Sequence, residues 1–171
     1  MNQGLWSRVA ECLKGRPERL SVARILVVNG FCVRDNRIFC NEIEVPIVGV
    51  AKAAGVDRRT VVETIKMISE VPELKSIFTN IRSAGSSLKE IARNLDFGVI
   101  EITPDDPRTI GILAKAASLV SGRGITIRQT LCDDPELHPE PKLTFIVEKK
   151  IPGELIPEFL KIKGVEKVSV Y

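Results

Sequence analysis

The spacing of apolar residues predicts helices over most of the first half of the chain. In LWSRVAECLKG they recur at three- and four-residue intervals, and Gly15 and Pro17 follow as stop signals. A second helix is predicted from Pro17 to Gly30, because proline is favoured in a first turn and glycine just past the last one. Further helices are predicted for VPIVGVAKAAG, GVDRRTVVETIK and VPELKSIFTNIRSAG, the first of them opened by Pro46.

A short hairpin interrupts these helices. FCVRDNRIFC has β-forming residues on both sides of Asp35-Asn36, a pair that suits a two-residue turn. In that register Cys32 faces Phe39, so we expect no disulfide between Cys32 and Cys40.

The second half alternates strands and helices in a different order. Strands are predicted for FGVIEI, GITIRQTLC, LTFIVEK and VEKVSVY, and helices from Asp105 to Ser121 and over ELIPEFLKIK. This β-α-β-β-α-β order is that of the ferredoxin-like split βαβ arrangement. We therefore expect both helices on one face of a single sheet, with the other face left for a partner or ligand.

A short helix is predicted to join the two halves. Ser87 and Glu90 have the spacing of a capping box, which would start a helix to about Leu95 and leave no flexible linker. The prediction is an α+β protein with two domains, a helical domain over residues 1–95 and a βαββαβ domain over residues 96–171.

Two details of the second half have more than one interpretation. In the strand GITIRQTLC, alternation predicts Ile125, Ile127 and Leu131 on one face. Arg128 is then on the open face, either paired across a dimer or in solvent. The connector DDPELHPEPK is either a stiff, solvated loop that exposes His138, or a second ligand or metal contact. The acidic residues of that second interpretation are Asp133, Asp134 and Glu136.

Composition restricts the class of protein. Apolar residues make up 44% and charged residues 27% of the 171 residues, an ordinary globular balance. No run approaches ~18 apolar residues, so no membrane span is expected. MNQGLWSRVAECLKGR has no long apolar stretch and no cleavage signature, so we expect no signal peptide and a cytoplasmic protein with reduced cysteines.

The sequence indicates no enzyme. It contains neither a P-loop nor a dinucleotide-binding fingerprint. The four cysteines are scattered and there is one histidine, which argues against a zinc site or a histidine-based triad. Cys132 has no base near it in sequence, and a nucleophile needs activation. We expect no catalytic residue, metal or cofactor.

Residues 47–66 have the spacing of a helix-turn-helix, whose second helix enters the major groove of DNA. Gly55 suits the turn, and Asp57 is placed to cap the second helix. The apolar anchors are Val50, Ala54, Val56, Val61 and Ile65. The residues predicted to contact double-stranded DNA are Lys52, Arg58, Arg59, Thr60 and Lys66.

Other interpretations of the first half remain open. Residues 1–96 carry 15 lysines and arginines against 11 acidic residues, a net charge of +4, while residues 97–171 carry 10 against 11. This asymmetry permits a nucleic-acid surface without requiring one. The acidic residues Glu63, Glu70 and Glu73 would repel phosphates, and the 31–40 hairpin precedes the helix pair and so is not a simple wing. A partner-binding or dimerising module, or a structural three-helix core, is also consistent with the pattern.

The second half resembles a known family. FGVIEI, GILAKAASLVSGRGITIRQTLCDDP, PEPKLTFIVE and IPGELIPEFLKIKGVEKVSVY are similar to an ACT domain, a module that senses small molecules and often binds amino acids. With GVDRRTV, nearly the whole chain resembles an archaeal family of predicted regulators of amino acid metabolism. In that family a helix-turn-helix-like region precedes one ACT domain.

The resemblance implies a homodimer that binds an amino acid across its interface. The loop after the first strand and the start of the second strand would supply the site, and a regulatory effect on DNA binding would follow. The implied ligand-binding residues are Asp105, Asp106, Arg108, Thr109, Ile110, Gly111, Ile125, Thr126 and Ile127. Alternatively, Asp106 only caps the following helix and Gly111 only packs. A rival function is a regulatory module whose N-terminal domain docks on a metabolic enzyme without binding DNA.

Overall fold

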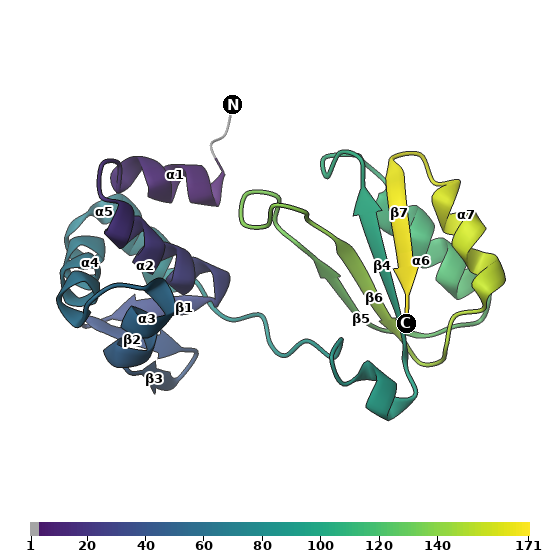
Figure 1. Cartoon of the computed structure of the whole chain (residues 1–171), viewed down its shortest axis with the longest axis horizontal. Coiled ribbons are helices and arrows are strands. Elements are labelled where there is room, and N and C mark those ends of the chain that lie inside the picture. The colour runs from purple at the N-terminus through teal and green to yellow at the C-terminus, as the bar shows by residue number, and fades with distance from the viewer. Residues whose placement is uncertain (1–3) are drawn as a thin grey trace. The chain divides into compact units, whose positions relative to one another are not determined.

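A computed structural model of the chain describes residues 4–171 and divides into two compact units (Figure 1). Unit 1 ends at Gly85 and unit 2 extends from Ser86 to Tyr171. The boundary predicted between residues 95 and 96 lies too far along the chain, because residues 86–95 pack on the sheet of unit 2. The protein is α+β, as predicted, with two antiparallel sheets. No helix in the described part is long and apolar enough to cross a membrane.

Unit 1 consists of helices around a small sheet, with a predominantly aliphatic interior. Its helices are α1 (Leu5–Cys12), α2 (Pro17–Val28), α3 (Ile47–Ala54), α4 (Arg58–Glu70) and α5 (Pro72–Asn80). Each predicted helix of this half is present, and Pro17 and Pro46 stand where the sequence predicted helix starts. The largest side chains fully buried in this unit are Leu13, Leu26, Ile38, Ile65, Ile68, Leu74 and Phe78.

The predicted hairpin is confirmed with its register. Asp35 and Asn36 both have positive φ, 49° and 56°, which is the type I′ turn that matches strand twist. The strands are β1 (Phe31–Arg34) and β2 (Arg37–Cys40), and Cys32 lies opposite Phe39. A third strand that the sequence did not indicate, β3 (Ile43–Val45), pairs with β2.

Gly30 fixes where the chain leaves unit 1. Its φ is +63°, and a Cβ at this position would lie 2.6 Å from the backbone of Ser83. Residues 82–83 therefore pass directly against the turn that follows α2, and a side chain at position 30 would displace them.

Unit 2 is a four-stranded antiparallel sheet with two crossover helices. Its elements are β4 (Gly98–Pro104), α6 (Ile112–Gly122), β5 (Ile127–Cys132), β6 (Leu143–Val147), the 3₁₀ turn η2 (Gly153–Leu155), α7 (Ile156–Leu160) and β7 (Val165–Val170). The strands lie in the order β5-β6-β4-β7. This is the split βαβ topology that the alternation of elements predicted.

The two faces of this sheet are covered differently. Both helices pack on one face, where Ile100, Phe145 and Phe159 belong to one apolar cluster, as predicted. The other face carries a smaller cluster of Ala92, Val99 and Ile146, with Leu88, Phe97 and Leu131 packed around it. The segment before β4 supplies Leu88, Ala92 and Phe97, so this segment covers part of the face that the sequence left open.

The predicted helix over residues 88–95 is wrong except for its last turn. Only Ala92–Leu95 is helical, as the 3₁₀ turn η1. Ser87 does not complete a capping box, since its hydroxyl accepts from the Lys89 amide instead, at 3.2 Å. The backbone of Ser86 and Leu88 is bound by the Gln129 side chain, and these tertiary hydrogen bonds replace the helical ones.

A β-bulge overturns the predicted faces of β5. The register against β6 shifts between Ile127 and Gln129, with Arg128 as the extra residue. As a result Ile127 packs in the helix-side cluster, whereas Leu131 packs on the opposite face. Strict alternation fails because one additional residue exchanges the faces beyond it.

Candidate functional site

The helix pair over residues 47–66 forms as predicted. Gly55 has φ +67° and ends α3 with a Schellman motif, in which the Val56 amide donates to the Ala51 carbonyl and the Gly55 amide to that of Lys52. Asp57 then caps α4, accepting from the Thr60 amide at 2.9 Å. This geometry leaves the first turn of α4 at the surface.

Thr64 is a polar residue of α4 and is fully buried. Its hydroxyl donates to the carbonyl of Thr60 at 2.7 Å, so the polar group is satisfied inside the helix. The packing of α4 is therefore not weakened by an unpaired hydroxyl.

The predicted DNA-contacting residues differ in their availability. Lys52 and Arg58 are exposed, and neither has an ion pair among residues 4–171. Arg59 is bound to Glu63 at 3.0 Å, and Lys66 lies 3.8 Å from Glu70. The Thr60 hydroxyl donates to Glu18 at 3.4 Å. Two of the five side chains thus stand free for a phosphate or base in the described part.

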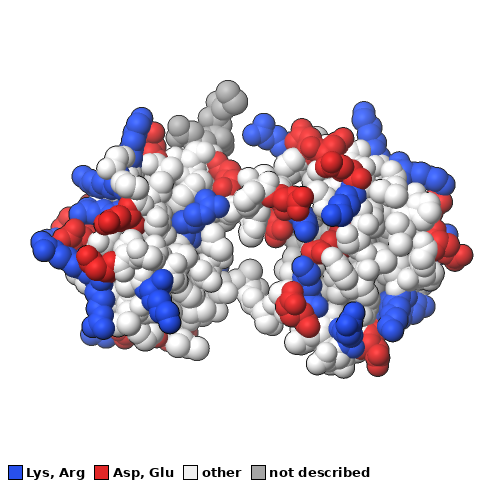
Figure 2. All heavy atoms as spheres, in the orientation of Figure 1, with Lys and Arg blue, Asp and Glu red and all other residues white. Residues whose placement is uncertain are grey.

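Acidic side chains are interleaved with these cations. Hydrogen bonds from Arg59 and from Arg19 hold the pKa of Glu63 below its ordinary value, so this carboxylate is ionised at neutral pH. On the face of unit 1 drawn in Figure 2, blue and red side chains are mixed and form no continuous basic patch. On this face, electrostatic attraction to DNA must therefore come from a small number of positions.

The predicted ligand loop is a turn rather than the start of a helix. The sequence placed the start of α6 at Asp105, but the helix begins at Ile112, with Gly111 as its N-cap at φ +94°. Asp106 does not cap the helix; it accepts from the Arg108 amide at 2.9 Å, and Asp105 accepts from the Asp106 amide at 2.6 Å. Both carboxylates are thereby tied to the loop backbone.

Thr109 and Ile110 have opposite environments within this loop. A Cβ on Gly164 would come within 2.6 Å of the Thr109 Cγ2 atom, and the Gly164 carbonyl accepts from the Asp105 amide at 3.0 Å. Thr109 therefore packs inward and anchors the loop beside β7. Ile110 is 96% exposed and points away from the core.

The two parts of the predicted ligand site lie at opposite ends of the sheet. Strands β4 and β5 each run antiparallel to β6 and are therefore parallel to each other. The loop 105–111 follows the end of β4, whereas Ile125, Thr126 and Ile127 stand at the start of β5. Ile125 is buried in the helix-side cluster, and the Thr126 carbonyl accepts from the Glu148 amide. A single copy of the chain does not bring these segments together.

The loop instead faces the far end of β5. Pro107, Thr109 and Leu113 line a cavity of about 130 Å³ together with Cys132 and Leu143. Burial and the neighbouring carboxylate of Asp133 raise the pKa of the Cys132 thiol, which keeps it protonated near neutral pH.

The acidic connector after β5 forms turns. Asp133 accepts from the Lys142 amide at 3.1 Å, and Asp134 from the Glu136 amide at 2.8 Å. Within residues 4–171 no group of three histidine, cysteine or acidic residues is arranged to hold a metal ion. His138, predicted to be exposed, is partly buried, because its amide closes a turn on the Asp134 carbonyl.

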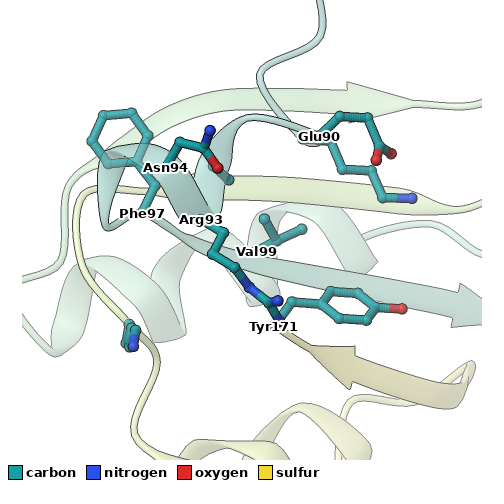
Figure 3. Close-up of a pocket in the computed structure, with 9 residues that line it drawn as sticks. Glu90, Arg93, Asn94, Phe97, Val99 and Tyr171 are labelled. Carbon is teal, nitrogen blue, oxygen red and sulfur yellow. The ribbon is translucent and has the colours of Figure 1, made fainter.

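A second site was missed by the sequence. On the sheet face opposite the helices, the buried carboxylate of Glu101 accepts from Lys89 at 2.8 Å and from the Tyr171 hydroxyl at 3.0 Å. Burial alone would raise the pKa of Glu101, but the hydrogen bonds from these two residues hold it below its ordinary value. The group adjoins a cavity of about 870 Å³ (Figure 3). The only sequence signal was a charged residue inside an otherwise apolar strand.

Comparisons with known proteins do not assign this chain to a family. No family model matches it, and no curated protein matches it. A solved transcriptional regulator from Neisseria meningitidis, in complex with L-Met, aligns over 91% of this chain and 86% of its own, with 11% sequence identity. The TM-score of 0.27 is too low for this alignment to establish a common fold or function.

Proposed function

We propose that this protein is a ligand-responsive regulator of amino acid metabolism and not an enzyme. Unit 2 acts as an ACT domain that binds a small molecule, an amino acid, between two copies of the chain. Unit 1 acts as a helix-turn-helix domain on double-stranded DNA. The proposal places the protein in the cytoplasm as a homodimer.

The observation that carries the proposal is the separation of loop 105–111 from residues 125–127 along the sheet. Strand β5 is an edge strand, so it can pair with β5 of a second copy. In an antiparallel pair, residues 125–127 of one copy approach the end of β5 in the other. The loop 105–111 lines the cavity at that end. Two copies therefore assemble a site that one copy lacks.

The other edge suits this pairing less well. Strand β7 exposes two charged side chains, Glu166 and Lys167, which oppose strand addition, whereas β5 exposes one, Arg128, which is paired with Glu148. At the β5 end, Ile110 and Leu113 are exposed, and a second copy would cover both. The apolar surface thus lies where the proposed dimer needs it.

The proposed site has groups suited to an amino acid. The free amides at the start of α6 match a carboxylate. Asp105 and Asp106 each use one oxygen inside the loop and keep the other for an ammonium group. Ile110 and Leu113 supply apolar contact for a side chain.

A thermal-shift screen of the proteinogenic amino acids tests ligand binding, with sedimentation velocity on the same samples. We expect one or a few amino acids to raise Tm and to favour the dimer. Replacing Asp105 and Asp106 by alanine should abolish the shift, whereas Glu166→Ala on β7 should keep it. A protein that stays monomeric with every amino acid, or a shift unaffected by the double substitution, contradicts the proposal.

A gel shift against genomic fragments, across a salt series, tests DNA binding. Affinity should fall as salt rises, by about one power of the salt concentration for each phosphate contact. Absence of binding, together with capture of a metabolic enzyme, would instead support the rival function in which unit 1 docks on an enzyme. The effect of the identified amino acid on DNA affinity then gives the coupling between the two units.

A further inference from the structure

A large cavity of unit 2 lies on the sheet face opposite α6 and α7. Its volume of about 870 Å³ falls in the range of small-molecule sites. The walls come from residues 89–97, the start of β4, Lys150 and the end of β7 (Figure 3). None of the residues that line this cavity belongs to the amino acid site proposed above, so the two sites are distinct.

Cationic side chains outnumber acidic ones in its walls. Arg93 and Lys150 are exposed, and neither has an ion pair among residues 4–171. Lys89 is bound to Glu101, and Glu90 is the carboxylate that lines the cavity. Glu101 balances the charge of Lys89. The walls then carry two further cations, Arg93 and Lys150, and one carboxylate, Glu90. The cavity therefore favours an anion.

The backbone fixes the position of Lys150. A Cβ on Gly98 would lie 2.6 Å from the Lys149 carbonyl oxygen and 3.2 Å from the Lys150 Cα atom. The chain after β6 thus passes tightly over the start of β4, which only glycine permits at this separation. Lys150 is held at the rim by this packing.

Apart from Asn94, the remaining walls are apolar or aromatic and are held in place. Ala92 and Val99 belong to the small cluster on this face, and Phe97 packs against it with the Arg128 guanidinium 5.5 Å from its ring centre. The hydroxyl of Tyr171 donates to buried Glu101, which restrains the tyrosine ring. Walls fixed in this way lose little conformational entropy when a flat apolar group binds.

We propose that this cavity binds a small carboxylate with an aromatic body. Arg93 and Lys150 hold the acidic group, and the ring lies against Val99 and Tyr171. Glu101 positions Lys89 and Tyr171 and does not touch the ligand. This site does not depend on the proposed amino acid sensor or on DNA binding.

The test is an ¹⁵N–¹H NMR titration of the full chain with benzoate, benzamide and acetate. Benzoate has both the charge and the ring, benzamide has the ring alone and acetate has the charge alone. We expect saturable shifts of the Arg93, Phe97 and Val99 amides with millimolar benzoate, and weaker effects from the other two probes. The amides of loop 105–111 should not respond.

Substitutions then identify the charges involved. Arg93→Gln and Lys150→Gln should each weaken benzoate binding about tenfold, the loss of one charge-assisted contact. Lys163→Gln, at an exposed lysine elsewhere in unit 2, is the matched control and should leave binding unchanged. All three positions are exposed, and each variant's own spectrum reports its folding. No benzoate shifts at these amides, equal binding of benzamide, or equal effects of all three substitutions would overturn the proposal.

Discussion

The side chain of Gln129 on β5 accepts a hydrogen bond from the backbone amide of Leu88 at 2.9 Å. The same side chain donates to the Ser86 carbonyl at 2.8 Å. The oxygen and the nitrogen of the Gln129 side-chain amide thus both hold residues 86–88, at the start of unit 2, against the edge strand β5. This contact replaces the predicted helix over residues 88–95 as the element that would couple β5 to the chain leading to unit 1.

Replacing Gln129 by alanine should release this segment. Two hydrogen bonds are lost, and we expect unit 2 to be destabilised by about 1–2 kcal/mol. Hydrogen exchange of the Leu88 amide should accelerate, because its acceptor is gone. NMR-detected exchange on the full chain measures this directly.

A glutamate at position 129 gives the matched comparison. It keeps an oxygen for the Leu88 amide but loses the donor to Ser86. We expect protection of the Leu88 amide to persist in Gln129→Glu and to vanish in Gln129→Ala. Equal exchange rates in both variants would show that packing of Leu88, and not the hydrogen bond, holds the segment.

Glu101 should make stability depend on pH in acid. Since its pKa is lowered in the folded protein, its contribution is complete above the ordinary value of 4.5 and is lost as pH falls through the folded value. Urea unfolding should therefore show Glu101→Gln less stable than the parent at pH 7, with the difference shrinking below pH 4.5. An exposed control, Glu166→Gln, should differ little from the parent at either pH.

Lys89 should make folding stability depend on pH in the alkaline range. Its hydrogen bond to Glu101 raises the pKa of the ammonium group above the ordinary 10.5. This contribution is complete below pH 10.5 and is lost only as pH rises through the higher folded value. Between the two limits the pair should add a constant increment to stability, and a steep change near pH 7 that depends on Glu101 would contradict the assignment.

Gly164 should not tolerate a side chain. Alanine there would combine φ +91° with a 2.6 Å approach to Thr109, and we expect a loss of about 2 kcal/mol. Gly122→Ala, at the end of α6 with open space around its Cβ position, should be neutral or stabilising by up to about 1 kcal/mol. Urea midpoints by circular dichroism compare the two. Similar losses in both variants would indicate that the loop around Thr109 adapts.

Arg58 and Arg59 should contribute unequally to DNA binding. Arg58 is exposed without an ion pair in the described chain, whereas Arg59 is held by Glu63 at 3.0 Å. Arg58→Ala should reduce the slope of log affinity against log salt by about 0.9, and Arg59→Ala by less. Glu63→Gln should strengthen binding. The opposite order of the two arginines would indicate that Arg59 leaves Glu63 when DNA binds.

Local signals account for the parts of the fold that the sequence predicted. Asp35-Asn36, Gly55 and Asp57 each determine a turn or cap within a few residues, and those elements form where expected. The topology of unit 2 followed from the order of helical and strand periodicities. In both cases the signal that predicts the structure lies within a short stretch of sequence.

The predictions that failed depend instead on contacts between segments that are distant in the sequence. The bulge at Arg128 arises in the pairing of β5 with β6. The loss of helix before Ala92 arises from contacts with β5 such as the Ser86–Gln129 hydrogen bond, between residues 43 positions apart. The Lys89–Glu101 pair and its cavity likewise need the folded sheet. The candidate DNA residues could be located on α3 and α4 from the sequence. The ion pair between Arg59 and Glu63, which competes with DNA contact by Arg59, depends on side-chain geometry and could not be predicted.

Gly30 and Gln129 together define a very short hinge. Ser83 is packed against the first and Ser86 is tied to the second, so only Ala84 and Gly85 stand between the two anchored points. With two soft dihedrals per residue, this leaves about four torsions in which motion can be absorbed. Any change in chain direction between Ser83 and Ser86 is therefore confined to these two residues.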